Sequence, residues 1–96
     1  MYRIFSYDGK YESTLDRLIS DDRVQTLSVS RRDGSDFNVD GKIVVIEGNQ
    51  DTMNSVFASV DFSFLNEIKG EKKDYIYKKI QAEDDEAAGG LGFIFQ

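Results

Sequence analysis

Residues 36–47, DFNVDGKIVVIE, decide the fold that this sequence predicts. Residues 42–47 contain the run IVVI, and β-branched residues favour strands. The pair Asp40-Gly41 precedes that run and suits a tight type I′ turn. Phe37 and Val39 alternate with polar residues before the turn, as expected of a half-buried strand. The stretch therefore predicts an antiparallel β-hairpin.

The hairpin register predicts which side chains share a face. With a two-residue turn, Val39 lies opposite Lys42, and residues opposite each other point to the same side. We therefore expect one face, which meets the helices, and one bare face. The helix-facing set is Phe37, Val39 and Val44, and the bare set is Thr26, Ser28, Ser30, Asn38, Ile43 and Val45.

The remaining elements follow from periods of 2 and 3.6 residues. Residues 52–62 fit either period, but their Val, Phe, Thr and Ser content favours a strand. Ser63 can cap a short helix, and Gly89-Gly90 is expected to end the last helix. The predicted strands cover residues 1–7, 23–30, 37–39, 42–47 and 52–62, and the predicted helices cover residues 10–20, 63–68 and 71–85.

These elements predict an α+β fold in one domain, residues 1–96. Their order is β-α-β-β-β-β-α-α, with an antiparallel sheet of about five strands and helices on one face, which is a two-layer α/β sandwich. Residues 1–7 are apolar on both faces, so their strand is expected to be central. Residues 89–96 read as a flexible or docking tail.

Composition removes several classes of function. The chain has no cysteine and no histidine, so thiolate chemistry, disulfides and the commonest general base are excluded. We therefore lean against an enzyme and expect no cofactor. The first residues lack the apolar run of a signal peptide, and no stretch is long and apolar enough to span a membrane. We expect a cytoplasmic protein that is a monomer or a weak homodimer.

The net charge of −6 is unevenly distributed. Acidic chains repel nucleic acid on average, but every arginine lies in the first third of the sequence. The adjacent Arg31 and Arg32 fall in a predicted turn, where they could contact a partner. The five arginines are Arg3, Arg17, Arg23, Arg31 and Arg32.

One motif resembles a metal site. The spacing D-x-[DN]-x-[DN]-G-x5-E is that of the calcium loop of EF-hands, and its ligands here would be Asp36, Asn38, Asp40 and Glu47. An EF-hand needs a helix on each side, whereas IVVI follows this loop directly. The hairpin interpretation is favoured, and the four residues remain a weak metal candidate.

Two further places could bind a ligand or a partner. The bare sheet face would present Ser28, Ser30 and Asn38. The tail LGFIF carries Phe93 and Phe95, and an exposed apolar segment of this kind either packs on the domain or meets a partner.

The chain resembles a family of small, uncharacterised archaeal proteins with a two-layer α/β sandwich. The similar stretches are KIVVIEGNQ (residues 42–50) and DYIYKKIQAEDDEAAGGLGFIF (residues 74–95). The resemblance implies an intracellular protein and carries no catalytic residue. The strand–helix order is also similar to one half of the TATA-box-binding fold, by fold analogy alone.

A binding or interaction module is therefore the favoured function, with a protein or a small ligand as partner. It would use the bare sheet face or the C-terminal tail. The first alternative is a nucleic-acid accessory protein that uses the arginine-bearing third. The second alternative, which is favoured least, is a carboxylate-based, metal-dependent enzyme.

Overall fold

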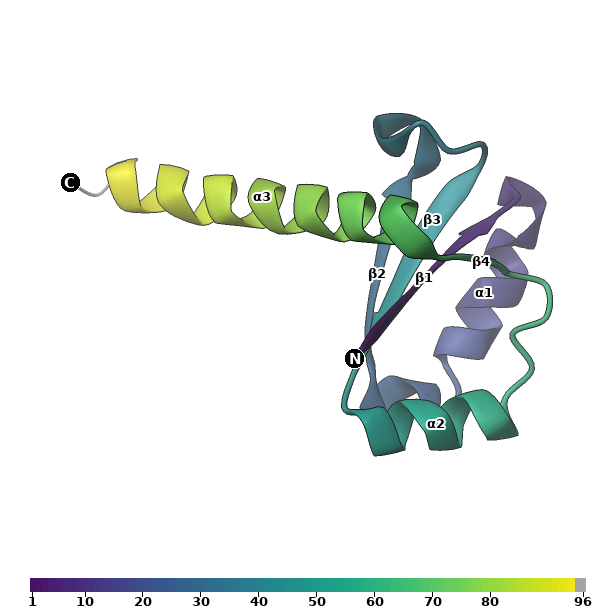
Figure 1. Cartoon of the computed structure of the whole chain (residues 1–96). Coiled ribbons are helices and arrows are strands. Elements are labelled where there is room, and N and C mark those ends of the chain that lie inside the picture. The colour runs from purple at the N-terminus through teal and green to yellow at the C-terminus, as the bar shows by residue number, and fades with distance from the viewer. Residues whose placement is uncertain (95–96) are drawn as a thin grey trace.

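The run IVVI lies in strand β3 (Lys42–Glu47), as predicted, and β3 is central in a four-stranded antiparallel sheet. The order of the strands is β2-β3-β1-β4 (Figure 1). In this computed structural model, the backbone of residues 1–94 and the side chains of residues 1–83 are described. The other strands are β1 (Tyr2–Tyr7), β2 (Ser28–Asp33) and β4 (Asn66–Ile68).

Helices cover both faces of the sheet (Figure 1). The α-helices are α1 (Glu12–Ile19), α2 (Gln50–Ser59) and α3 (Gly70–Ile94). Three short 3₁₀ helices join them to the strands: η1 (Gly9–Tyr11), η2 (Val24–Thr26) and η3 (Gly34–Phe37). The α+β class and the antiparallel sheet are confirmed, but within residues 1–94 the sheet has four strands rather than about five.

One face of the sheet packs against α1, α2 and η2. Phe5 and Val44 are neighbours across β1 and β3, and both point to this face. Burying each large apolar side chain contributes about 1.5–3 kcal/mol to stability. This cluster holds most of the buried apolar side chains. Its buried members are Phe5, Tyr7, Leu15, Val24, Leu27, Val44, Ile46, Met53, Val56, Phe62 and Leu65.

The opposite face packs against α3. Ile76 and Ile80 of α3 cover Ile4, Ile43 and Val45 of the two central strands. This is the face that the sequence predicted to be bare. The helices therefore lie on two sides of the sheet, because the aliphatic run in β3 supplies apolar side chains to both faces.

The connection between β2 and β3 differs from the predicted tight turn. Strand β2 continues to Asp33, which pairs with Lys42, so the predicted pairing of Val39 with Lys42 is wrong. The chain then forms η3, which ends at Asn38 with a left-handed φ of 57°. Local turn signals could not show this wider loop.

Burial of Phe37 explains the wider loop. Phe37 is fully buried and packs with Ile43 and Ile76 beneath α3. Val39 packs on the same side, whereas Val44 faces α1 and α2. The predicted common face of Phe37, Val39 and Val44 is therefore wrong.

Residues 50–59 form helix α2, so the strand predicted for residues 52–62 is wrong. Asn49 caps the helix, because its side chain accepts a hydrogen bond of 2.8 Å from the Thr52 amide. Met53 and Val56, three residues apart, are buried against the sheet. Capping and this burial outweigh the strand preference of the local residue types.

The chain between α2 and α3 also differs from the prediction. Residues 66–68 form the short edge strand β4 in place of a helix, and Ile68 pairs with Ile4 of β1. The helix predicted for residues 71–85 is confirmed but continues to Ile94, through Gly89-Gly90. A glycine in a helix costs about 1 kcal/mol relative to alanine, which does not by itself end the helix.

A candidate interaction edge at strand β2

Strand β2 brings together four of the residues that the sequence predicted for partner binding. It is the outermost strand on its side of the sheet. Ser28 and Ser30 pair with Glu47 and Val45 and so share the α3 face. Arg31 points to the face of α1. The predicted residues therefore lie on a sheet edge and not on an open sheet face or in a turn.

The outward side of β2 carries main-chain groups that do not face β3. The Gly34 amide donates to the Gly41 carbonyl oxygen over 3.0 Å, so these residues form a hydrogen-bonded pair at the end of the ladder. Bonding alternates along an antiparallel strand. Ser30 therefore bonds to β3, while Val29 and Arg31 direct their N–H and C=O groups outward, where the Arg31 carbonyl oxygen already accepts a hydrogen bond of 2.9 Å from Arg32 Nη1. We call this outward side the free edge of β2.

Arg31 fixes the free edge to helix α1. Its Nη1 donates to Glu12 Oε2 over 2.9 Å, and its Nη2 donates to Asp16 Oδ1 over 2.7 Å. Charged side chains on an edge strand usually oppose pairing with another strand. Here two carboxylates neutralise the guanidinium, so its charge presents less of an obstacle.

A polar pocket of about 290 Å³ lies beside this ion pair and contains Tyr7 and Lys42. The Tyr7 hydroxyl donates to Glu12 Oε1 over 2.7 Å. Burial, and then the hydrogen bond to Glu12, raise the pKa of the Tyr7 phenol. A phenol with a raised pKa stays protonated and is a poor general base. The polar side chains of this pocket hold Glu12 of α1 in place, which favours a structural role for them.

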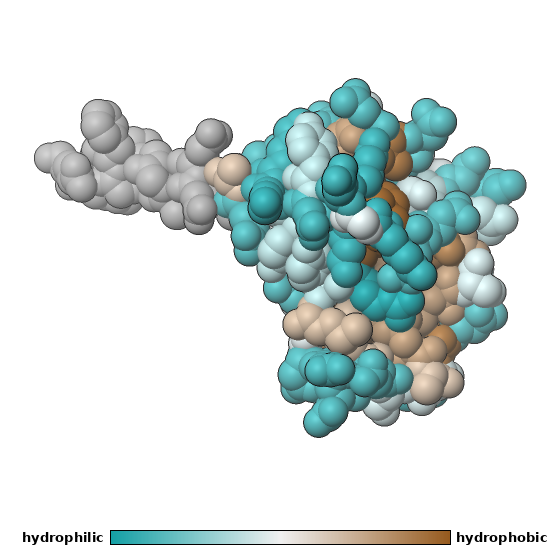
Figure 2. Space-filling model, viewed as in Figure 1, coloured by the Kyte–Doolittle hydropathy of each residue, from teal (hydrophilic) through white to brown (hydrophobic). Residues whose placement is uncertain are grey.

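Helix α3 extends past the free edge of β2 (Figure 1). Among the side chains that the structure describes, Ile80 is the last of α3 in the buried cluster, and residues 81–83 are exposed. Hydrophilic side chains cover the outer side of its docked part (Figure 2). Residues 81–94, which we call the overhang, are about 20 Å long at 1.5 Å per residue. The overhang and the free edge form two sides of one open corner.

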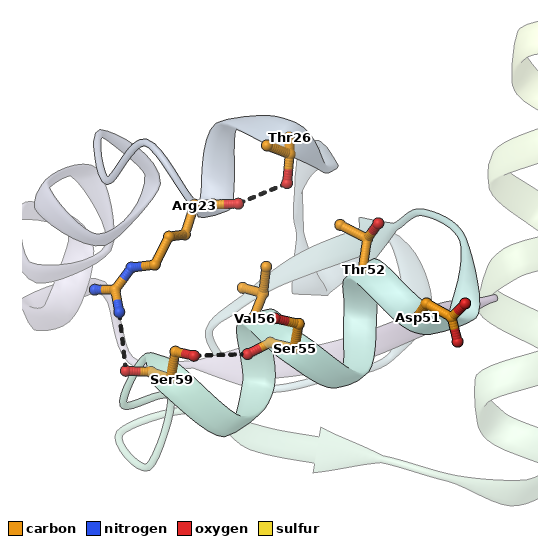
Figure 3. A pocket seen from close by; sticks show the side chains of 7 residues that line it. All are labelled: Arg23, Thr26, Asp51, Thr52, Ser55, Val56 and Ser59. Atoms are coloured by element: carbon orange, nitrogen blue, oxygen red, sulfur yellow. Dashed lines mark hydrogen bonds between the residues drawn. The ribbon is translucent and has the colours of Figure 1, made fainter.

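A separate groove lies between η2 and α2, with a volume of about 370 Å³ (Figure 3). Hydroxyl groups and Arg23 line it, above Val56. Arg23 binds both carboxylate oxygens of Asp21 and donates over 3.3 Å to the Ser59 carbonyl oxygen. The guanidinium is thus engaged in joining η2 to the end of α2, which favours a structural role.

The candidate calcium ligands are not brought together. Asp36, Asn38 and Asp40 lie in the loop between β2 and β3, whereas Glu47 lies at the far end of β3. Glu47 lies five residues beyond Lys42 along β3, which places it about 16 Å from the loop. Glu47 instead accepts a 2.7 Å hydrogen bond from the Tyr77 hydroxyl. Among the described residues, these four cannot share one ion.

The other predicted contacts have different outcomes. The Asn38 carbonyl oxygen accepts a hydrogen bond of 3.1 Å from Lys72 of α3, so Asn38 helps to hold α3 on the sheet. Arg32 directs its Nη1 to the Arg31 carbonyl oxygen over 2.9 Å. The side chain of Phe93 and the whole of Phe95 lie outside the described part, so their predicted role stays a prediction.

Sequence reasoning missed two parts of this region. Tyr7 and Glu12 were assigned to the core and to a helix, and only the return of β2 beside α1 brings Arg31 to them. The overhang is not predicted by the sequence, because Gly89-Gly90 is typical of a helix end. The contact between Tyr7 and Glu12 could have been predicted, because the two residues lie on either side of a sharp turn at Asp8-Gly9.

Comparison with known proteins adds no relative. No family model matches the chain, no curated protein matches it, and no solved structure matches it. The predicted resemblance to an archaeal family stays a prediction. Within residues 1–94, none of the helices is both long and apolar enough to cross a membrane.

Proposed function

We propose that this protein is an interaction module that binds an extended segment of polypeptide at the free edge of β2, beside the overhang of α3. The observation that carries the proposal is the corner itself. A six-residue strand edge with outward main-chain groups meets a helix that continues past it. Adding a strand to an exposed edge is a common mode of peptide recognition.

The two sheet edges differ in a way that favours β2. Strand β4, at the opposite edge, has three residues, and short edge strands resist pairing. Strand β2 has six, which is the usual length of a strand. A bound segment at β2 would form main-chain hydrogen bonds with Val29 and Arg31, and its side chains would alternate between the α3 and α1 faces.

The arginine-based alternative has less support. Several arginines are held by carboxylates: Arg3 by Glu67, Arg23 by Asp21, and Arg31 by Glu12 and Asp16. Phosphate binding would have to break these pairs in a chain of net charge −6. Strand addition needs none of these ion pairs to break, and the Arg31 carbonyl oxygen would accept a second hydrogen bond beside the one from Arg32.

The test uses a displayed library of random eight-residue peptides. Peptides that bind the full chain are selected and then tested against Val29→Pro, which removes an outward N–H and leaves the ladder to β3 in place. We expect Val29→Pro to stay folded by circular dichroism and to lose the selected peptides. Ser55→Ala on α2 is the control and should bind them normally. Equal binding by Val29→Pro would overturn the proposal.

A further inference from the structure

We propose that the segment bound at the free edge is β2 of a second copy of this chain, paired antiparallel about a two-fold axis. The inference rests on the proposed function, because it uses the same edge. Two sheets of four strands would then form one sheet of eight. Two-fold dimers are the commonest assemblies of soluble proteins, and two features of β2 and α3 favour one here.

The first feature is the pattern of side chains along β2. In the register that places Ser30 on the axis, Val29 pairs with Arg31 of the second copy, and both are outward residues, as a hydrogen-bonded pair requires. Ser28 then pairs with Arg32. Each cationic residue faces a neutral one, and five residues of each strand take part.

Other registers are less favourable. Placing Arg31 on the axis sets two clusters of Arg31 with Glu12 and Asp16 opposite each other, and each cluster carries an excess of negative charge. Placing Arg32 on the axis sets two Arg32 side chains opposite each other on the other face. Like charges directly opposite each other are destabilising. Placing Val29 on the axis avoids that clash but leaves only Ser28, Val29 and Ser30 of each β2 strand to pair. The strand therefore selects the Ser30 register.

The second feature is the length of the overhang. At about 4.8 Å per strand, four strands are about 19 Å wide. The overhang is about 20 Å long. It would therefore reach across the whole sheet of the second copy and not beyond it.

The two α3 helices would fit side by side. An axis perpendicular to the sheet places both helices on the same face, running antiparallel. A six-residue strand is about 20 Å long, which is enough for two helices of about 10 Å diameter. On this face β2 presents Ser28, which is exposed, and Ser30, which is half-buried. Small side chains there allow a helix to approach closely.

The test places charges on the two-fold axis. In Ser30→Glu the paired strands carry two anions opposite each other, and in Ser30→Lys two cations. We expect each variant to self-associate about fivefold more weakly than the wild type. An equimolar mixture of the two should form a heterodimer at least as tight as the wild-type dimer. Sedimentation equilibrium of the full chain, whose monomer mass is 10.9 kDa, measures all three.

The controls separate this proposal from the proposed function. Ser55→Glu and Ser55→Lys change an exposed serine on α2 and should leave self-association unchanged. A wild-type chain that stays monomeric at millimolar concentration would overturn the two-fold pairing, as would Ser30 variants that dimerise normally. If the chain is monomeric but still loses selected peptides on Val29→Pro, the edge binds another protein and only the dimer proposal fails.

Discussion

The hydroxyl of Tyr7 donates a 2.7 Å hydrogen bond to Glu12, and this contact joins the end of the central strand β1 to the start of helix α1. The same carboxylate accepts Arg31 from β2, so one glutamate links three elements. Tyr7 is 2% exposed. Its hydroxyl therefore has few other partners, and the contact is expected to contribute to stability.

Replacing Tyr7 by phenylalanine should lower the free energy of unfolding by about 1 kcal/mol, the usual net value of a hydrogen bond. Urea denaturation at pH 7 measures the change. The ring stays in the core, so no cavity term is added. A variant as stable as the wild type would show that the Glu12 carboxylate is satisfied without Tyr7.

The same variant has an expected signature at high pH. The pKa of Tyr7 is raised above its ordinary value of 10, first by burial and then by Glu12. Above pH 10 the unfolded chain loses this proton while the folded chain keeps it, so stability falls as the pH rises. We expect the wild type to lose more stability than Tyr7→Phe between pH 10 and pH 11. Parallel losses in both proteins would contradict the raised pKa.

Gly34 and Gly9 form a matched pair for the loop between β2 and β3. A Cβ at Gly34 would lie within 2.5 Å of the Gly41 carbonyl oxygen, whereas a Cβ at Gly9 meets nothing within 4 Å. Gly34→Ala should cost about 1–3 kcal/mol, the usual cost of overpacking. Gly9→Ala should stay close to the wild type. Thermal denaturation followed by circular dichroism compares them, and equal melting temperatures would refute the close approach.

Ile76 is the residue of choice for testing how α3 is held. It is fully buried between α3 and the sheet. Ile76→Ala should cost about 2–5 kcal/mol, as for other large-to-small core substitutions. Tyr75→Ala is the control, because the neighbouring Tyr75 is 49% exposed and should be nearly neutral. Similar losses in both variants would mean that α3 is not held by its buried face.

Asp21 is expected to titrate far below other aspartates. Hydrogen bonds from the Arg23 side chain and then from the Arg23 amide lower its pKa to about 2. A lowered pKa means that the carboxylate stabilises the fold above pH 4 and that this contribution is lost as the pH falls toward 2. NMR titration of the carboxyl carbon measures the midpoint. In Arg23→Ala it should move back toward 3.8, and an unmoved midpoint would exclude the pair as the cause.

The sequence predicted well those elements whose pattern is local. The apolar residues of β1 favour a central strand, and β1 is central in the sheet. The IVVI run favours a strand, and it lies in β3. Leu15 has helical spacing with its neighbours and is fully buried in α1. These assignments needed no knowledge of distant parts of the chain.

The sequence could not predict where a distant contact decides between two local forms. Residues 52–62 fit two periods, and the Asn49 cap together with burial of Met53 selects the helix. Phe37 fits a strand, but its position beneath α3 selects the wider loop. Ser28 and Ser30 were predicted on a bare sheet face because α3 was expected on the other side, and Arg31 and Arg32 were predicted in a turn, whereas all four lie in β2.

The position of β1 determines the order in which this chain can assemble. Phe5 lies between Val44 on one side and Glu67 on the other, so β1 gains its second neighbour only from residues sixty or more positions away. The contacts between β2 and β3 span much shorter loops, and short loops close at a smaller entropic cost. We therefore expect that hairpin to form early as a template, with β1 among the last strands to be completed.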